Sequence, residues 1–278
     1  MKISVIIPTF NRIGLLQRAI DSVLNQSLKP YEIIVVDDGS TDGTGDIIKQ
    51  KYKSIKIIQQ KNSGVSAARN NGIKHAKGDW IALLDSDDEW NKDKIGQQVN
   101  RLTDNPKYNF CHTNEIWIRN GIRVNQKKKH KKYGGFIFEK CLDICRISPS
   151  SVLFNKNILN RVGLFNDKLP VCEDYDLWLR ITADFEILFI DEPLITKYGG
   201  HDDQLSRSIE AIEKFRIKAL EGILENSNLS KYNRVRAVEM IIKKLNIYYN
   251  GLVKRKKHVE AKKVTEKIKF WNKNLFEY

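Results

Sequence analysis

The sequence predicts an α/β fold in which a mainly parallel sheet is flanked by helices and followed by a basic helical tail. Three observations lead to this prediction. Short runs of β-branched residues alternate with helix-length segments along the first ninety residues, and polar clusters follow the ends of four of these runs. From about Ser208 a lysine-rich helical periodicity replaces this pattern. At 278 residues, 41% of them apolar, the chain can bury a substantial core.

The first ninety residues predict a β-α-β-α-β-α-β series. Residues 3–8 are almost continuously apolar, which is typical of a strand covered on both faces. Apolar residues then recur at helical spacing over 13–24. The elements predicted after these are a strand at 32–36, a helix at 42–52 with Asp42 as its N-cap, a strand at 55–60, a helix at 65–76 and a strand at 79–84. Single helices between strands imply right-handed crossovers and parallel pairing.

The rest of the chain has a looser pattern. The predicted elements are, in order, a helix at 91–103, a hairpin that turns at Asn120 and Gly121, an exposed loop at 127–132, a strand at 150–154, and a helix from about Glu173 followed by a strand. The helical periodicity then continues to the end. We therefore expect an α/β domain over 1–206 and a basic helical extension over 207–278.

Net charge restricts the partners of the protein. The formal charge is +14, and residues 207–278 contribute +10 of it through eighteen lysine and arginine residues against eight glutamates. Such a surface suits an anionic membrane or an acidic polymer, or it is simply a solvated helix face. The basic residues lack the aromatic interleaving of single-strand readers, so no nucleic acid is expected as a partner.

No segment predicts export or membrane insertion. The first apolar run has only the length of a strand, and no stretch approaches the roughly 18 apolar residues of a membrane span. The expected location is therefore the cytoplasm, with the tail as a means of peripheral attachment to the inner face of the cell membrane. Cys111, Cys141, Cys145 and Cys172 are expected to be reduced thiols, because they are too few for a disulfide scaffold and lack zinc-ligand spacing.

The four polar clusters lie at the predicted carboxyl ends of the strands, where open parallel sheets bind ligands. In chain order they are TFNR, DDGSTD, NSGVSAARN and DSDDEW. The last cluster places four acidic residues within five positions, and carboxylates this close repel one another unless a cation or hydrogen-bond donors compensate them. Mg²⁺ and Mn²⁺ are held by such carboxylates together with phosphate oxygens. A divalent cation is therefore the first expectation at this cluster.

Taken together, these motifs resemble glycosyltransferase family 2, whose members are inverting enzymes of the GT-A fold that use nucleotide-diphosphate sugars. The matching segments are ISVIIPTFNR, VVDDGSTD, NSGVSAARNNGI, LLDSDDEW and CEDYDLWLRI, in this order over residues 3 to about 206. The resemblance implies a metal-dependent transferase, with uridine favoured as the base, that builds a cell-surface glycan on a saccharide or lipid-linked acceptor.

The resemblance also implies the donor and metal residues. Those expected to bind the nucleotide sugar are Pro8, Thr9, Asn11, Asp38, Arg69, Asp85 and Asp87. Within this set Asp38 matches an aspartate that binds the nucleobase, and Arg69 an arginine near the nucleotide. Asp87 is also expected to hold Mn²⁺ or Mg²⁺, with His201 as a further ligand or a contact to the diphosphate. Asp88 is a secondary metal candidate and Arg207 a weaker phosphate candidate.

On the acceptor side Asp174 matches the general base of similar inverting enzymes. Inversion requires one displacement, so one base suffices, unlike the paired carboxylates of a glycosidase. Glu173 is expected to bind the acceptor or to hold Asp174 in place; alternatively, both acids only favour a helix N-terminus. Trp178 lies one turn after Asp174, where it either forms an apolar wall of the acceptor site or packs in the core.

Two other classes of protein stay open at this point. A nucleotidyltransferase has a similar sheet, but it would show a glycine-rich phosphate loop after the first strand, and IIPTFNR lacks one. A non-catalytic nucleotide-sugar or glycan-binding protein would not need the complete set of acidic residues.

Overall fold

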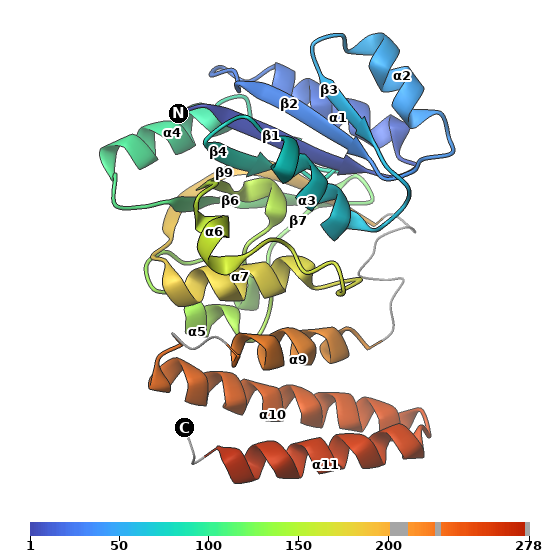
Figure 1. The fold of residues 1–278 in the computed structure, drawn as a ribbon, viewed down its shortest axis with the longest axis vertical. Coiled ribbons are helices and arrows are strands. Elements are labelled where there is room, and N and C mark those ends of the chain that lie inside the picture. Colours follow the sequence, from blue (N-terminus) through green and yellow to red (C-terminus); the bar gives the residue numbers. More distant parts are fainter. Residues whose placement is uncertain (201–210, 226–228, 276–278) are drawn as a thin grey trace.

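The computed structural model describes residues 1–200, 211–225 and 229–275. A nine-stranded mixed sheet, ordered β3-β2-β1-β4-β8-β6-β9-β5 with β7 paired to β6, has helices on both faces and a stack of helices beneath it (Figure 1). The strands are β1 (Ile3–Thr9), β2 (Glu32–Asp37), β3 (Lys56–Gln59), β4 (Trp80–Leu83), β5 (Glu89–Trp90), β6 (Phe110–Arg119), β7 (Ile122–Val124), β8 (Leu153–Asn155) and β9 (Leu188–Gly199). The helices are α1 (Ile13–Leu24), α2 (Thr44–Lys51), α3 (Val65–His75), α4 (Lys94–Asp104), α5 (Phe138–Cys141), α6 (Ile158–Val162), α7 (Glu173–Asp184), α9 (Ile212–Ile223), α10 (Lys231–Lys254) and α11 (His258–Asn274).

The first four strands confirm the predicted β-α-β series. Strand β1 pairs in parallel with β2 and β4, and β2 pairs in parallel with β3. Alternate residues of β1 enter opposite cores, since Ile6 faces α3 whereas Val5 and Ile7 lie in the core under α1. One detail was wrong: the N-cap of α2 is Gly43, not Asp42. Asp42 Oδ1 instead accepts a hydrogen bond from the Thr44 amide at 3.0 Å.

The second half of the sheet is mixed rather than parallel. Strand β8 is antiparallel to both β4 and β6, and β5 is antiparallel to β9, whereas β6 and β9 run parallel. The predicted hairpin is confirmed, because Asn120 and Gly121 have φ angles of +50° and +77°, as a two-residue turn requires. The strand expected at 150–154 is shorter, because a 3₁₀ turn at Pro149–Ser151 precedes β8.

The lysine run 127–132 was expected to be exposed, and its last residue is not. Lys132 is buried, with its Nζ 3.1 Å from Glu115 Oε2 and 2.9 Å from the Arg146 carbonyl oxygen that accepts its hydrogen bond. Glu115 on β6 supplies the opposite charge, which offsets the desolvation cost of burying the Lys132 ammonium. The expectation failed because the two partners, Glu115 and Arg146, lie 17 and 14 residues away from Lys132 in the sequence.

The basic tail is helical as predicted, and it packs onto the α/β domain. Figure 1 shows α9, α10 and α11 stacked in antiparallel order beneath α7. One continuous core extends from the α3 face of the sheet through α7 to Leu220, Val238 and Val264 of the three tail helices. The predicted domain boundary at 206 and 207 lies outside the described residues. None of the described helices has both the length and the apolar character of a membrane span.

Helix α4 begins with a lysine that is completely buried. The Lys94 ammonium donates a hydrogen bond to Gln98 Oε1 at 2.7 Å and lies 3.9 Å from the centre of the Trp90 ring. Burial lowers the pKa of Lys94 to about 7, because the charged form loses its hydration. This amine therefore titrates near neutral pH.

Replacing Lys94 with methionine is expected to stabilise the protein most at neutral and acidic pH. The pKa is about 7 in the folded state and 10.5 in an exposed chain, so the cost of burial is complete below pH 7 and disappears as the pH rises through 10.5. The gain in unfolding free energy should be on the order of a few kcal/mol at neutral pH. Urea unfolding of both proteins at about pH 6.5 and about pH 9.5 measures it. A gain independent of pH would mean that folded Lys94 keeps its charge.

Candidate active site

The polar clusters that follow β1, β2, β3 and β4 come together at the carboxyl edge of the parallel half-sheet. The loops after β1 and β2 are joined by the Asp38 amide, which donates to the Thr9 carbonyl oxygen at 2.9 Å. The Asn11 side chain also bridges them, because its Oδ1 accepts from the Thr41 amide at 2.7 Å. Asn11 has a φ of +50°, a left-handed conformation that asparagine tolerates better than most residues.

Asp38, the expected nucleobase residue, organises this edge. Its Oδ1 accepts from the Gln60 side-chain amide at 2.7 Å and the Ser63 amide at 2.9 Å, and its Oδ2 accepts from the Gly64 amide at 2.8 Å. A carboxylate has about four acceptor positions, so Oδ2 has room for one further donor. Beside it the Thr9 hydroxyl is buried and has no hydrogen-bond partner among the described residues. Pro8 is buried next to Thr9 in β1.

Arg69 on α3 joins the two acidic parts of the site. One guanidinium nitrogen lies 2.7 Å from Asp85 Oδ1 after β4, and the other lies 2.6 Å from Glu173 Oε1 at the start of α7. The Arg69 side chain is only 4% exposed and lies beneath the site, and its contact with a nucleotide stays a prediction. Burial opposes its charge, but Asp85 and Glu173 outweigh this effect and raise the pKa of Arg69.

The acidic loop after β4 separates its carboxylates into two environments. Asp87 is partly accessible, its Oδ2 lies 3.1 Å from Arg12, and its carbonyl oxygen accepts from Arg18 at 2.6 Å. Burial and the nearby charge of Asp85 raise the pKa of Asp87, whereas Arg12 lowers it. Asp88 points inward, where it accepts from the Ser150 hydroxyl at 2.6 Å, and burial raises its pKa well above the usual range. Asp88 is thus held inside the protein by Ser150, and its secondary role as a metal ligand stays a prediction that this burial does not favour.

Asp174 and Glu173 occupy the first turn of α7, opposite the acidic loop. Asp174 Oδ1 accepts from the Tyr175 amide at 2.6 Å, and its Oδ2 lies 3.3 Å from Cys145 Sγ. Glu173 is buried against Arg69. Burial raises the pKa of Glu173 to about 7, the charge of Asp174 adds to this effect, and Arg69 opposes it. Glu173 therefore anchors the start of α7, while Asp174 next to it keeps a carboxylate with few protein partners.

Lys197 on β9 is a second cation, besides Arg69, that faces both acidic groups. Its ammonium donates to the Ser148 hydroxyl at 3.3 Å. Burial opposes the charge, but carboxylates on both sides of the site raise the pKa of Lys197 above its usual value. The carboxylates that do so are Asp88, Glu115, Asp85 and Asp174. This lysine therefore compensates the like charges that the loop after β4 and the start of α7 bring together.

Trp178, the expected acceptor wall, is a core residue. It is 2% exposed, and its ring packs edge-on against Phe110 at 5.4 Å and Phe165 at 6.2 Å between centroids. The alternative that we left open, core packing, is the one that the structure shows.

His201 and Arg207 lie outside the described residues. Within the part of the chain that is described, no group of three or more histidine, cysteine, aspartate or glutamate side chains is arranged to hold a metal ion. The donor set nevertheless fits a divalent cation, because Asp85 and Asp87 both retain exposed carboxylate surface. Hard cations such as Mg²⁺ need only one or two protein carboxylates when a diphosphate supplies further oxygens.

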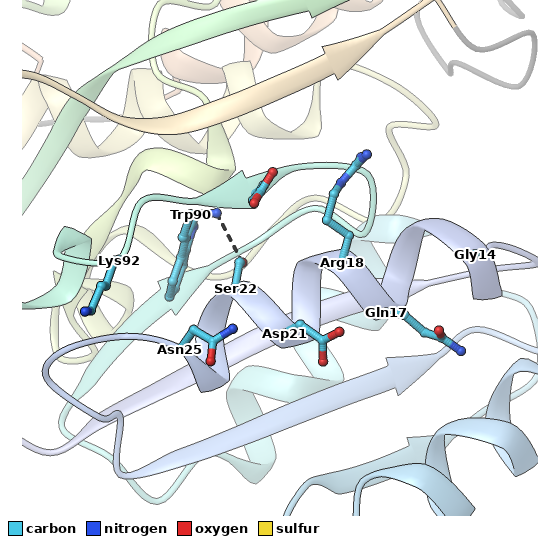
Figure 2. Close-up of a pocket in the computed structure, with 9 residues that line it drawn as sticks. Gly14, Gln17, Arg18, Asp21, Ser22, Asn25, Trp90 and Lys92 are labelled. Carbon is cyan, nitrogen blue, oxygen red and sulfur yellow. Dashed lines mark hydrogen bonds between the residues drawn. The ribbon is translucent and has the colours of Figure 1, made fainter. Parts of the chain in front are cut away.

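A separate groove of about 550 Å³ lies between α1 and β5 (Figure 2). Trp90 closes its floor, where the Trp90 amide donates to the Ser22 hydroxyl at 3.1 Å. Arg18 belongs to the rim of this groove but reaches Asp87, and its guanidinium lies 3.6 Å from the centre of the Tyr198 ring. The Tyr198 hydroxyl in turn donates to Glu89 at 2.7 Å. Arg18 thus connects the rim of this groove to the acidic loop of the candidate site.

Sequence reasoning missed several residues that shape the site. They are Arg12, Arg18, Cys145, Ser150 and Lys197. One signal was available for Lys197, because an isolated lysine within the apolar segment of β9 must find an acidic partner if it is buried. The others come from loops or helix faces where a polar residue is ordinary.

A parallel half-sheet with carboxylates at its strand ends and a second acidic pair opposite them is the architecture of GT-A type glycosyltransferases. The chain belongs to glycosyl transferase family 2, since the model of that family matches residues 4–163. This assignment confirms the predicted fold and class of enzyme, and it removes the nucleotidyltransferase alternative.

Relatives and solved structures agree with this assignment. The chain is 35% identical to an uncharacterized glycosyltransferase of Rickettsia conorii over 84% of its own length and 38% of that protein. It is 33% identical to the Escherichia coli glucosyltransferase WfaP over 91% of this chain and 94% of WfaP. The crystal structure of S. aureus TarS 1-349 superimposes with a TM-score of 0.67 at 21% identity, covering 90% of this chain and 72% of that structure. The chain thus spans well under half the length of its Rickettsia relative.

Replacing Arg69 with methionine is expected to destabilise the protein by about 3–5 kcal/mol, because Asp85 and Glu173 lose the charge that compensates them. Arg69→Lys should recover part of this loss, since one ammonium cannot span both carboxylates. The measurement is urea unfolding. Arg101→Met is the matched control: Arg101 forms an exposed ion pair with Glu192 at 3.4 Å and should cost less than about 1 kcal/mol. Equal losses in the two methionine variants would contradict a central role for Arg69.

Proposed function

We propose that the protein is an inverting, metal-dependent glycosyltransferase that moves a sugar from a nucleotide-diphosphate donor, with uridine as the base, to a hydroxyl of an acceptor in cell-surface polymer synthesis. The observation that carries this proposal is the Arg69 bridge, which holds Asp85 of the donor side against Glu173, the neighbour of the proposed base. WfaP is named as a UDP-Glc:alpha-D-GlcNAc-diphosphoundecaprenol beta-1,3-glucosyltransferase, which supports a UDP-sugar and a lipid-linked acceptor for this chain.

On the donor side Asp87 would hold Mn²⁺ or Mg²⁺, with Asp85 close to the sugar or ribose and His201 as a further ligand. When bound, the metal would supply Lewis-acid stabilisation to the departing diphosphate. Asp38 and the Thr9 hydroxyl, which has no hydrogen-bond partner among the described residues, would line the base pocket, where Asp38 Oδ2 can accept one more hydrogen bond. Arg12, next to Asp87, presents a guanidinium whose geometry suits phosphate oxygens.

On the acceptor side Asp174 would act as the general base. It takes the proton of the acceptor hydroxyl while that oxygen forms a bond to the anomeric carbon, and the bond from this carbon to the diphosphate oxygen breaks. One such displacement inverts the anomeric configuration. Glu173, held by Arg69, fixes the turn from which Asp174 projects, so its role is positioning rather than acceptor binding.

The deciding experiment separates donor binding from turnover. Calorimetric titration of UDP, TDP and GDP should show binding of UDP that depends on Mn²⁺, and Asp87→Ala should lose this dependence. Asp174→Asn should bind UDP as the wild type does but lower the rate of sugar transfer from UDP-glucose by about 10²–10⁴-fold. If Asp174→Asn turns over normally, Asp174 is not the base. If no nucleotide binds, the non-catalytic alternative gains support.

We also propose that the turn between α10 and α11 docks to an anionic membrane. All of residues 253–259, with the sequence VKRKKHV, are exposed, and four consecutive cations lie between Val253 and Val259. The positive φ of Lys256, +57°, helps to close this turn. Figure 1 shows the turn on the same side of the molecule as the carboxyl ends of β1 and β2. Each cation near an anionic bilayer contributes about 1 kcal/mol to the free energy of membrane binding. Docking through this turn would place the site close to a lipid-linked acceptor.

The docking turn is tested by reversing its charge. Lys254→Glu, Arg255→Glu and Lys256→Glu together should lower binding to vesicles that contain phosphatidylglycerol at least about a hundredfold, because about 3 kcal/mol of attraction is lost. Flotation measures the bound fraction, with neutral phosphatidylcholine vesicles as the reference. The matched control reverses three exposed lysines at the end of α2, at positions 49, 51 and 53. Equal loss in both triple variants would assign binding to net charge alone and contradict docking by this turn.

A further inference from the structure

The carboxylate of Asp174 has a thiol as its side-chain neighbour. Cys145 Sγ lies 3.3 Å from Asp174 Oδ2 and 3.3 Å from the Ile147 carbonyl oxygen, so one S–H group faces two acceptors. The other carboxylate oxygen, Oδ1, accepts from the Tyr175 amide within the same helical turn. The two oxygens of Asp174 therefore have different partners, a backbone amide and a thiol.

This thiol is a hydrogen-bond donor. Burial raises the pKa of Cys145 well above its usual value, and the charge of Asp174 raises it further, so the sulfur keeps its proton at neutral pH. A protonated thiol is a weak nucleophile but can donate to a carboxylate. The role of Cys145 must therefore follow from its position and its S–H group.

The loop that carries Cys145 is fastened to the surrounding helices. The guanidinium of Arg146 contacts both oxygens of Asp143 at 3.0 and 2.9 Å. Lys244 of α10 donates to the Asp143 carbonyl oxygen at 2.7 Å, and the Tyr175 hydroxyl donates to the Leu142 carbonyl oxygen at 2.5 Å. Helices α7 and α10 thus hold the loop from two sides, so the sulfur has a fixed place relative to Asp174.

We infer that Cys145 is a positioning residue for Asp174: its S–H group binds Oδ2 and fixes the orientation of the carboxylate that receives the proton of the acceptor. The inference rests on the proposed function, since it deepens the role of the same carboxylate. The thiol keeps its own proton throughout, and no covalent bond to sulfur forms or breaks. Without this contact the carboxylate loses one of its two fixed partners and rotates more freely, which lowers the fraction of productive complexes.

The contact is tested by the reactivity of the thiol, which needs no substrate. Alkylation of Cys145 by iodoacetamide at about pH 8 is followed by mass spectrometry of its peptide. Asp174→Asn should accelerate it about tenfold, because removal of the adjacent charge increases the thiolate fraction. Asp184→Asn, an equal change of charge at the far end of α7, is the matched control and should leave the rate unchanged. An unchanged rate in Asp174→Asn would overturn the contact.

The positioning role is tested by kinetics with UDP-glucose and an α-GlcNAc-diphospho-lipid, the substrates in the name of WfaP. Cys145→Ala should lower kcat about three- to tenfold with little change in the KM for UDP-glucose, and Cys145→Ser, which keeps a donor, should recover most of the loss. Cys111→Ala, at a buried thiol on β6 that contacts Gln98, is the control. Equal losses in the serine and alanine variants, or a change in KM alone, would overturn the role.

The two proposals fail in distinguishable ways. If Asp174→Asn retains turnover, the assignment of Asp174 as the base is wrong. If Asp174→Asn is inactive but Cys145→Ala matches Cys111→Ala, only the positioning role is wrong. In the Asp174→Asn background, Cys145→Ala should cause no further loss, because the thiol acts through that carboxylate. If the chain does not turn over these substrates, unchanged alkylation of Cys145 in Asp174→Asn still overturns the inference.

Discussion

The buried guanidinium of Arg69 is the interaction on which the rest of the site depends. It binds Asp85 after β4 and Glu173 at the start of α7, and these two carboxylates are brought together from distant parts of the sequence. Two acids cannot lie this close in a poorly hydrated interior without a cation between them. A permanently charged, planar group with two separate donor edges meets this need better than an ammonium would. The relative position of the acidic loop and α7 is therefore fixed by one side chain of α3.

Around this bridge, the acidic residues have different neighbours and differ in their access to solvent. Asp88 is turned inward to Ser150 and stays out of reach of solvent, whereas its neighbour Asp87 is partly accessible beside Arg12. Lys197 faces the acids from the opposite strand and offsets the remaining repulsion. Adjacent residues of the same chemical type thus differ in environment because they lie in a tight turn, in which the Asp88 amide donates to the Asp85 carbonyl oxygen at 3.1 Å. A motif alone cannot assign which aspartate of such a series meets a ligand.

Much of the fold could be predicted from the sequence, because it depends on local pattern. Continuous apolar runs identified β1 and β2, and turn chemistry identified the hairpin at Asn120 and Gly121. The meeting of the polar clusters at one edge of the sheet could be predicted because parallel strands have their carboxyl ends on the same side. Burial of Trp178 could not be assigned, since a tryptophan on an amphipathic helix suits a core or a ligand wall equally. The partners of Lys132 and Lys197 could not be found either, because both are distant in sequence. Lys132 pairs with Glu115 of β6, and Lys197 faces the same Glu115 because β9 lies beside β6.

The basic tail, which its charge alone marks as an appendage, is part of the scaffold around Asp174. Lys244 of α10 is buried, and its charge is balanced by Glu213 of α9 at 2.9 Å. The same ammonium fastens the Asp143 carbonyl oxygen, in the loop that leads to Cys145. Lys244 thus forms contacts inside the protein, whereas other lysines of the tail face solvent. Because one helix serves both purposes, changes to the solvent face of α10 leave the loop beside Asp174 in place, whereas loss of Lys244 would release it.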